Sequence, residues 1–349
     1  MYKGTGISKD QLSDDGEPCI LYGELYTKYK SETIREVISK TNINNTKLVR
    51  SKANDVIIPC SGETAEDIAT ARCVLNGNIL LGGDLNIIRL HGYDGAFMSY
   101  QLNGRRKYDI AKVAQGVSVV HLYGEHLKGV KTINPCLEEQ KKIAKLLSLL
   151  DERIATQNKI IDKLQSLIKG IRNDVFGKLR KSIGFNAMIS DVLCYEQPQP
   201  YIVGNTEYTA EGIPVLTANK AFVLGYTLET DGIYDKGDCI IFDDFTLDCK
   251  YVDFPFKVKS SAIKILTAKN KELLRYTFEF LKYLDLSTEE HKRHYIAETQ
   301  NQEIILPTEQ IVKTIAHIFS TLSVRMETAV KQKNVFEKQK QYLLRQMFI

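Results

Sequence analysis

The chain has 349 residues, of which 43% are hydrophobic and 26% are charged. These proportions exclude a largely disordered protein, and the length predicts two or three domains at ~150 residues per domain. No run reaches the ~18 uncharged apolar residues of a membrane-spanning helix, and the first residues lack the apolar core of a signal peptide. We therefore expect no membrane among its partners.

The seven cysteines are odd in number, scattered, and without a CxxC pair. This pattern is typical of reduced thiols and argues against a disulfide framework or a zinc site. We therefore expect a cytoplasmic protein.

The net charge of +4 is unevenly distributed along the chain. It is +1 over residues 1–130, +6 over 131–181, −7 over 182–306 and +4 over 307–349. The basic excess thus lies in two separate segments.

The first basic segment has the apolar periodicity of a long helix. From Ile143 onward, successive apolar residues are alternately four and three positions apart over more than four heptads, and only Gln157 interrupts this spacing. The alternative is an ordinary bundle helix, but the regularity favours a two-stranded coiled coil. The predicted seam consists of Ile143, Leu147, Leu150, Ile154, Ile161, Leu164, Ile168 and Ile171.

The second basic segment repeats the first at an offset of 172 residues. Pro307 corresponds to Pro135, and Phe348 corresponds to Phe176. Proline is favourable just ahead of a helix, because the first turn has no amide partner to lose. We expect the two helices to pair with each other. The seam of the second helix is predicted to include Phe319, Leu322, Met326, Phe336 and Leu343.

The segments ahead of the helices are also related, though more loosely. Residues 16–20 resemble 212–216, and residues 54–58 resemble 237–241, each a short β-rich run bounded by turn residues. We therefore predict an α+β fold in which two mixed α/β domains are separated by two long antiparallel coiled-coil helices, as an internal pseudo-two-fold repeat. The predicted segments are a first domain 1–134, a helix 135–181, a second domain 182–306 and a helix 307–349.

Catalytic motifs are not evident. There is neither a GxxxxGK[ST] phosphate loop nor a GxGxxG after a strand. The triplet from Asn134 to Cys136 lacks the second proline and the aromatic residue of an amino-methyltransferase loop. Asp243 and Asp244 are either metal ligands or an acidic turn, and the turn is favoured because no further ligands accompany them. We predict a non-catalytic chain that binds no metal or cofactor.

Cations beside hydroxyl and tyrosine residues in predicted loops suit DNA, because cations contact phosphates while hydrogen-bonding side chains read base edges. The net −7 of the second domain argues against purely non-specific binding there. The candidate DNA-binding residues are Lys52, Ser61, Arg72, Arg105, Arg106, Lys107, Gln115, Ser118, Thr217, Asn219, Lys220, Thr246, Lys250, Tyr251, Lys257, Lys259, Ser260, Lys292 and Arg293.

Taken together, these features resemble the specificity subunit of type I restriction–modification systems. The resemblance covers essentially the whole chain, and the duplicated order of the motifs is more specific than any single motif. The matching segments are 16–20, 81–85, 115–118, 212–216, 237–242 and the helix starts after Pro135 and Pro307.

The resemblance implies two target-recognition domains that each read one half of a bipartite, asymmetric site in double-stranded DNA. It implies that modification subunits carrying S-adenosylmethionine methylate adenine N6, and that restriction subunits use ATP and Mg²⁺ to translocate and cut DNA. This chain would then bind no cofactor itself. The expected partners are DNA, the modification subunits and the restriction/translocase subunits.

Two departures and two alternatives accompany this interpretation. The first domain has a shorter opening segment than the second, so we expect either a shortened start or the product of a rearranging locus. The second domain lacks a counterpart of Gly116 and Ser118 before its helix. The alternatives are a coiled-coil interaction adaptor with no DNA role and a fragment of a fused restriction–methylation enzyme.

Overall fold

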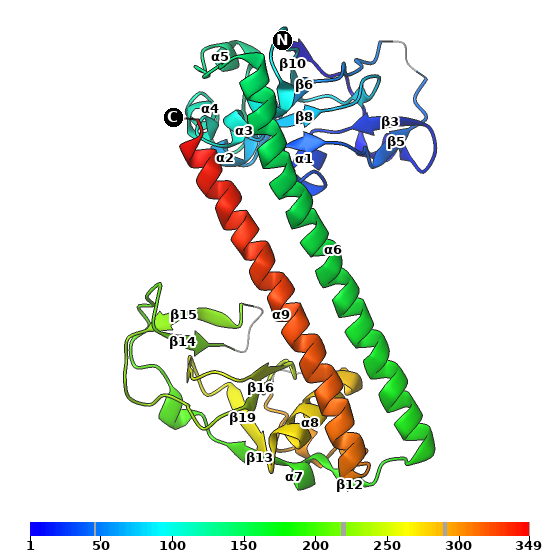
Figure 1. Ribbon diagram of the computed structural model, residues 1–349, viewed down its shortest axis with the longest axis vertical. Helices are drawn as coiled ribbons and strands as arrows, with labels where there is room; N and C mark the ends of the chain where they lie inside the picture. The colour runs from blue at the N-terminus through cyan, green and yellow to red at the C-terminus, as the bar shows by residue number, and fades with distance from the viewer. Residues whose placement is uncertain (45–46, 218–220, 289–291, 349) are drawn as a thin grey trace. The chain divides into compact units, whose positions relative to one another are not determined.

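A computed structural model describes residues 1–44, 47–217, 221–288 and 292–348 (Figure 1). The chain divides into two compact units, unit 1 with residues 1–159 and 330–349, and unit 2 with residues 160–329. The long helices α6 (Leu137–Ser182) and α9 (Glu309–Gln346) contribute to both units. The predicted α+β class with two long helices is confirmed, while the bounds of the four predicted segments stay a prediction.

Unit 1 contains two small sheets and several short helices. The first sheet has the strand order β1 (Tyr2–Lys3), β10 (Leu85–Ile88), β6 (Asp55–Pro59), β8 (Arg72–Val74), β4 (Thr33–Ile34). The second has the order β2 (Leu12–Ser13), β5 (Ser39–Thr41), β3 (Glu17–Ile20), β9 (Leu80–Leu81). A further pair joins β7 (Ser61–Gly62) to β11 (Val120–His121). The helices are α1 (Glu24–Thr27), α2 (Ala65–Ile68), α3 (Gly95–Asn103), α4 (Lys107–Lys112) and α5 (Gly124–Lys128), with a 3-10 turn at Lys9–Gln11.

Unit 2 repeats this plan. One sheet has the order β13 (Leu193–Glu196), β19 (Ile263–Ala268), β16 (Cys239–Asp243), β17 (Cys249–Val252). The other has the order β15 (Val223–Thr227), β14 (Ile213–Leu216), β18 (Lys257–Val258), and β12 (Ala187–Met188) pairs with β20 (Glu303–Ile304). Its helices are α7 (Ile189–Val192) and α8 (Lys271–Leu284), with 3-10 turns at Gln199–Tyr201 and Thr299–Asn301.

The strand pairing confirms the predicted repeat. β3 pairs in parallel with β9, and β14 pairs in parallel with β18, so the segments 16–20 and 212–216 hold equivalent places. Gly16 and Gly212 both have positive φ, +106° and +127°, and a Cβ on either would lie 2.4 Å from the carbonyl oxygen of a threonine in the neighbouring strand. Only glycine tolerates that conformation at such close approach, which explains why this residue recurs in both copies.

The long helices begin shortly after Pro135 and Pro307, as predicted. In unit 1, the Gln157 side chain donates to the Gln332 Oε1 at 3.2 Å, and Arg153 lies 5.5 Å from the centre of the Phe336 ring. Because the residue number falls along α9 as it rises along α6, the helices are antiparallel there. Gln157, the break in the apolar seam, thus meets a polar partner.

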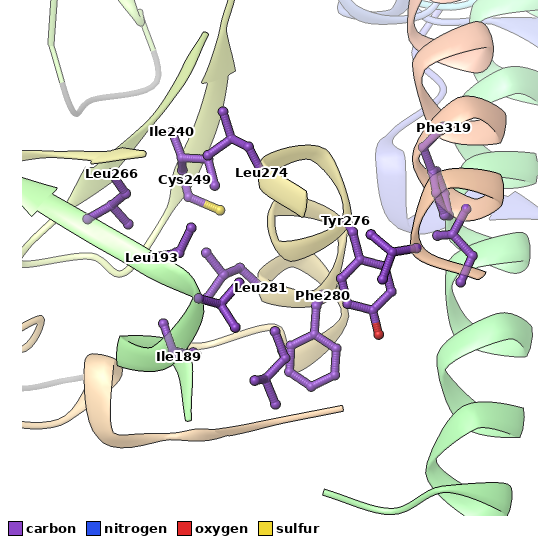
Figure 2. Packing of buried hydrophobic residues seen from close by; sticks show 14 of the residues in the cluster. Ile189, Leu193, Ile240, Cys249, Leu266, Leu274, Tyr276, Phe280, Leu281 and Phe319 are labelled. Atoms are coloured by element: carbon purple, nitrogen blue, oxygen red, sulfur yellow. The ribbon is translucent and has the colours of Figure 1, made fainter. Parts of the chain in front are cut away.

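The apolar cores of the units include residues from the long helices. In unit 2, residues of β13, β16, β19 and α8 pack with Phe319 of α9 (Figure 2). The ring of Phe176 lies 5.4 Å from that of Tyr276 in α8, and in unit 1 the ring of Phe348 lies 5.4 Å from that of Phe97 in α3. Phe176 and Phe348, predicted as equivalents, therefore each anchor a domain helix. Within the described residues, no helix combines the length and apolar character needed to cross a bilayer.

Candidate nucleic-acid interface

The turn between α3 and α4 carries the densest run of cations in unit 1. Arg105 is exposed, and Arg106 and Lys107 are half-buried. Arg106 forms a 3.4 Å ion pair with Asp109, one turn along α4. This pair lies at a partly exposed site where such contacts contribute little, so the turn retains a basic surface that suits phosphate contacts.

A cavity of about 730 Å³ brings Ser61, Arg72 and Ser118 together, although they are distant in the sequence. We call it the tyrosine cavity. Its walls come from α1, β7, α2 and the segment before β11, and they are formed by Tyr22, Gly23, Leu25, Tyr26, Thr27, Lys30, Ser61, Gly62, Glu63, Asp67, Thr70, Arg72, Ser118 and Val119.

The floor of the tyrosine cavity is held by internal hydrogen bonds. The Tyr26 hydroxyl donates to the Ser61 carbonyl at 3.0 Å, and burial, with a smaller contribution from Asp67, raises the pKa of Tyr26 well above its usual range. Burial likewise raises the pKa of the neighbouring Cys60 thiol to about 11. Both groups therefore stay protonated at neutral pH, so Tyr26 remains a donor and Cys60 is a poor nucleophile.

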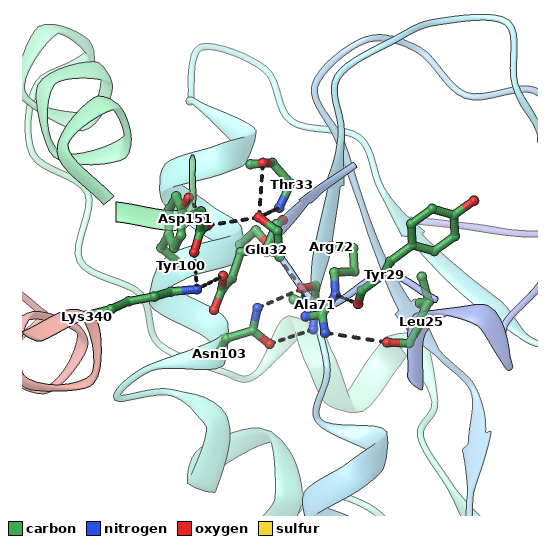
Figure 3. Close-up of polar contacts among 12 residues, drawn as sticks. Leu25, Tyr29, Glu32, Thr33, Ala71, Arg72, Tyr100, Asn103, Asp151 and Lys340 are labelled. Atoms are coloured by element: carbon green, nitrogen blue, oxygen red, sulfur yellow. Dashed lines mark hydrogen bonds and ion pairs between the residues drawn. The ribbon is translucent and has the colours of Figure 1, made fainter. Parts of the chain in front are cut away.

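Arg72 is buried, which is not where a DNA contact was predicted. Its guanidinium donates to the carbonyls of Tyr29 and Ala71 at 2.9 Å and to that of Leu25 at 3.4 Å (Figure 3). Burial lowers its pKa, and the nearby carboxylates Glu32 and Asp151 oppose that shift. Arg72 therefore has a role inside the domain, where it joins α1 to β8 and balances buried negative charge.

The same carboxylates receive Lys340 of α9. Its ammonium lies 2.5 Å from Asp151 of α6 and contacts Glu32, while the Tyr100 hydroxyl donates to Asp151 at 2.7 Å (Figure 3). Burial opposes the charged form of Lys340, but the two carboxylates outweigh it and raise its pKa. Lys340 lies four residues after Phe336 and three before Leu343, at the spacing of the predicted seam, and the buried network explains a charged residue there.

In unit 2, the turn after β16 and the loop before β19 form a second candidate surface. Thr246, Lys259 and Ser260 are exposed there. Arg293 donates to the Ser261 hydroxyl at 3.2 Å and lies 6.0 Å from the centre of the Phe245 ring. A cation, hydroxyls and an exposed aromatic ring thus meet on one face of this domain.

The acidic residues of that turn are structural. The Asp243 carboxylate accepts from the amide of Phe245 at 2.9 Å, and the Asp244 carboxylate accepts from that of Tyr295 at 2.8 Å. Asp244 also lies 3.3 Å from Lys264. These bonds fix the turn that presents Thr246.

Other predicted contacts in unit 2 are turned inward. Lys257 is buried, lies 2.5 Å from Glu229 and donates to the Asp231 carbonyl at 2.8 Å. Thr217 is buried as well. Because desolvated and paired groups cannot meet a phosphate, Lys257 stabilises the domain interior instead of the predicted surface.

Lys250 and Tyr251 of β17 are half-buried and held by protein partners. Lys250 lies 3.2 Å from Asp248, and the Tyr251 hydroxyl donates to Asp238 at 2.6 Å. They line a cavity of about 350 Å³ between β17, α8 and α9.

The remaining predictions fall on exposed loops or outside the described residues. Lys52, Gln115 and Lys292 are exposed. Asn219 and Lys220 lie outside the described residues. The sequence prediction missed Tyr22, 38% exposed, and Val117, 97% exposed; an apolar residue between Gly116 and Ser118 was the available signal for the latter.

Comparisons with known proteins agree with this architecture. The sequence model of the family described as Type I restriction modification DNA specificity domain matches residues 3–166. The Escherichia coli Type I restriction enzyme EcoR124I/EcoR124II specificity subunit is 45% identical over 126 residues, which are 34% of this chain and 31% of that protein.

A second curated relative is more distant. The Methanocaldococcus jannaschii Type I restriction enzyme MjaVIII specificity subunit is 28% identical over 158 residues, which are 45% of this chain and 35% of that protein. The matched segments thus span about a third of the length of each of these two relatives.

A solved structure extends the comparison to the whole chain. The crystal structure of the Type-I restriction-modification system S subunit from M. genitalium matches with a TM-score of 0.70 and 17% identity, covering 100% of this chain and 93% of that chain. At this identity the match shows a shared fold, including the second half that the family model does not reach.

Proposed function

We propose that the chain supplies the DNA specificity of a type I restriction–modification complex, which the resemblance in its sequence and the match of residues 3–166 to a type I DNA specificity domain support. In this proposal each β-rich domain reads one half of a bipartite site in double-stranded DNA, and the paired helices set the gap between the half-sites. The observation that supports it best is the repeat itself: two domains whose central strands pair in the same order, each built onto stretches of the same two helices.

The differences between the copies support an asymmetric site. The exposed groups of unit 1 include the basic turn at Arg105 and the tyrosine cavity, whereas unit 2 presents Thr246 and Arg293 beside Phe245. Because side chains at base edges determine which bases are accepted, two surfaces of different composition are expected to select different half-sites.

The chemistry is assigned to other subunits. Modification subunits with S-adenosylmethionine would methylate adenine N6, and restriction subunits with ATP and Mg²⁺ would translocate and cut DNA, all in the cytoplasm. The acidic turn at Asp243 and Asp244 supports a non-catalytic chain, since its carboxylates hold backbone amides. This subunit would then supply only the DNA sequence specificity of the complex.

The test is genome-wide mapping of N6-methyladenine in cells that express the chain with its modification subunit. We expect one bipartite methylated motif that disappears when the chain is deleted and returns with a plasmid copy. A motif that persists in the deletion strain, or the lack of any motif that depends on the chain, would contradict the proposal and favour an interaction adaptor.

A further inference from the structure

The tyrosine cavity has the size and lining of a ligand site. Its volume of about 730 Å³ falls within the ~300–1,000 Å³ that is usual for small-molecule sites, which combine apolar and aromatic walls with a few polar groups. Tyr22, Tyr26, Leu25 and Val119 supply the apolar and aromatic surface here.

The charges of the wall disfavour a phosphate. Lys30 and Arg72 are balanced by Glu63 and Asp67. Moreover, the Lys30 ammonium donates to the Tyr26 carbonyl at 2.6 Å, and the Arg72 guanidinium is committed to backbone carbonyls. The two carboxylates are exposed, so the cavity suits a neutral, flat ligand that donates hydrogen bonds.

A rigid hairpin, residues 115–121, stands beside the cavity. The amide of Gln115 donates to the His121 carbonyl at 2.9 Å, and the amide of His121 donates back at 2.7 Å. Gly116 has φ +124°, where a Cβ would lie 2.1 Å from the Val119 carbonyl. The hairpin is also attached to β7 by the pairing of His121 with Ser61, so its tip is fixed in place.

That tip presents an apolar side chain to solvent. Val117 is 97% exposed and does not line the cavity, whereas the neighbouring Ser118 and Val119 do. Exposing an apolar residue on a constrained tip has no stabilising value for the fold. Apolar side chains in such positions on DNA-binding proteins enter between base steps and unstack them.

We propose that the hairpin unstacks one base of the bound DNA with Val117 and that the tyrosine cavity receives this base, which carries an exocyclic amino group. Tyr22 supplies the stacking surface, and Glu63 and Asp67 accept hydrogen bonds from the amino group, as carboxylates do from cytosine N4. The inference rests on the proposed function, because its ligand is a base of the DNA that this chain reads.

The experiment places 2-aminopurine at successive positions of a duplex that contains the methylated motif, with the full chain bound to its modification subunit. Unstacking of the base increases 2-aminopurine fluorescence. The position of the methylated adenine serves as an internal reference, because the modification subunit is expected to extrude that base from the duplex. We expect a second bright position, at a base that is not methylated, with a signal at least threefold above free DNA.

Variants of the cavity and the hairpin test whether the fluorescence increase at that second position depends on them. Tyr22→Ala and Val117→Ser should abolish the brightening there and weaken binding about tenfold, in the range of a lost base–aromatic stack. Tyr108→Ala and Val335→Ser remove exposed side chains of the same types outside the cavity and the hairpin in the same unit, 70% and 60% exposed, and should change neither signal. Thermal unfolding of each variant verifies the fold.

The outcomes separate the two proposals. If the complex binds the motif with high affinity but 2-aminopurine fluorescence increases only at the position of the methylated adenine, the cavity inference is wrong and the specificity function stands. If Tyr22→Ala instead releases the modification subunit and leaves the fluorescence intact, the cavity is a protein-docking site, which also overturns the inference. If no DNA is bound at all, both proposals fail.

Discussion

Lys340 of α9 lies 2.5 Å from Asp151 of α6, and this ion pair joins the two long helices where the β-rich domain of unit 1 also contributes Glu32 and Tyr100. Two carboxylates, this lysine and Arg72 form a largely buried set of balanced charge. Removal of one partner leaves a buried charge uncompensated, which costs far more than an exposed pair contributes.

Lys340→Met is therefore expected to lower the free energy of unfolding by about 3–5 kcal/mol. Lys338→Met is the matched control, because Lys338 is exposed on the same helix, and its effect should stay within about 0.5 kcal/mol. Urea unfolding followed by circular dichroism at neutral pH measures both. Equal effects of the two substitutions would contradict the buried network.

The pH dependence of that difference has a defined sign. The pKa of Lys340 is raised in the folded protein above the ~10.4 of an unfolded lysine. Its contribution is therefore fully present below about pH 10 and is lost as the pH rises through the folded pKa. The stability difference between the wild type and Lys340→Met should stay constant from pH 7 to 9 and shrink near pH 11. A difference that grows at alkaline pH would argue against the ion pairs.

Unit 2 has its own charged junction. The Glu279 carboxylate of α8 accepts from Arg172 of α6 at 2.7 Å and from Arg275 at 2.8 Å, and all three side chains are largely buried. Glu279→Gln should destabilise the protein by about 3–5 kcal/mol because two guanidinium groups lose their anion. Glu272→Gln, on the exposed side of α8, should cost under about 1 kcal/mol.

A double substitution checks that this effect comes from the junction. Arg172→Met combined with Glu279→Gln should destabilise by clearly less than the sum of the single changes, since both remove the same interaction. Thermal and urea unfolding of the four variants measure the coupling. Additive effects would mean that Arg172 and Glu279 act independently.

The repeated glycine is testable at one position. Gly16→Ala places a methyl group at φ +106°, 2.2 Å from the Asn42 side-chain oxygen, and should cost about 1–3 kcal/mol. Gly6→Ala has no atom within 4 Å of the added carbon and should change stability by less than about 0.5 kcal/mol. Melting temperatures compare the two, and equal values would refute a conformational requirement at Gly16.

The basic turn gives a prediction on DNA binding. Alanine at Arg105, Arg106 and Lys107 together should weaken binding of the complex to its motif and make the slope of log K against log salt shallower by up to ~2.7, for three lost phosphate contacts. Lysine at the two arginine positions retains the charge and should preserve the slope. Fluorescence anisotropy between 50 and 200 mM salt measures the binding constant. Over this range the affinity of a protein with six or more phosphate contacts usually falls by ~10³-fold or more. An unchanged slope in the alanine variant would place the phosphate contacts elsewhere.

The predictions that succeeded rest on local periodicity. Apolar residues spaced alternately by four and three positions from Ile143 define one face of a helix regardless of what surrounds it. The helices α6 and α9 begin shortly after Pro135 and Pro307, from which their starts were predicted. Gly16 and Gly212 were found as a repeated pattern because a positive φ at a close approach restricts the residue type in any context.

The candidate site was less accessible to sequence reasoning. Arg72 and Lys257 carry the same charge as Arg105, but their side chains are desolvated and paired inside the domains. Burial depends on contacts between segments far apart in the chain, and a cation gives no local sign of it. The tyrosine cavity likewise collects residues from 22 to 119.

The sequence by itself thus determined the repeat, the paired helices and the family resemblance, because each is a pattern of residue types that can be recognised along the chain. The tertiary structure alone decided which cations remain on the surface, how the charge of Lys340 is compensated, and how the hairpin at Val117 comes to lie beside a cavity. Those features depend on dielectric environment and on contacts that form only when the chain is folded.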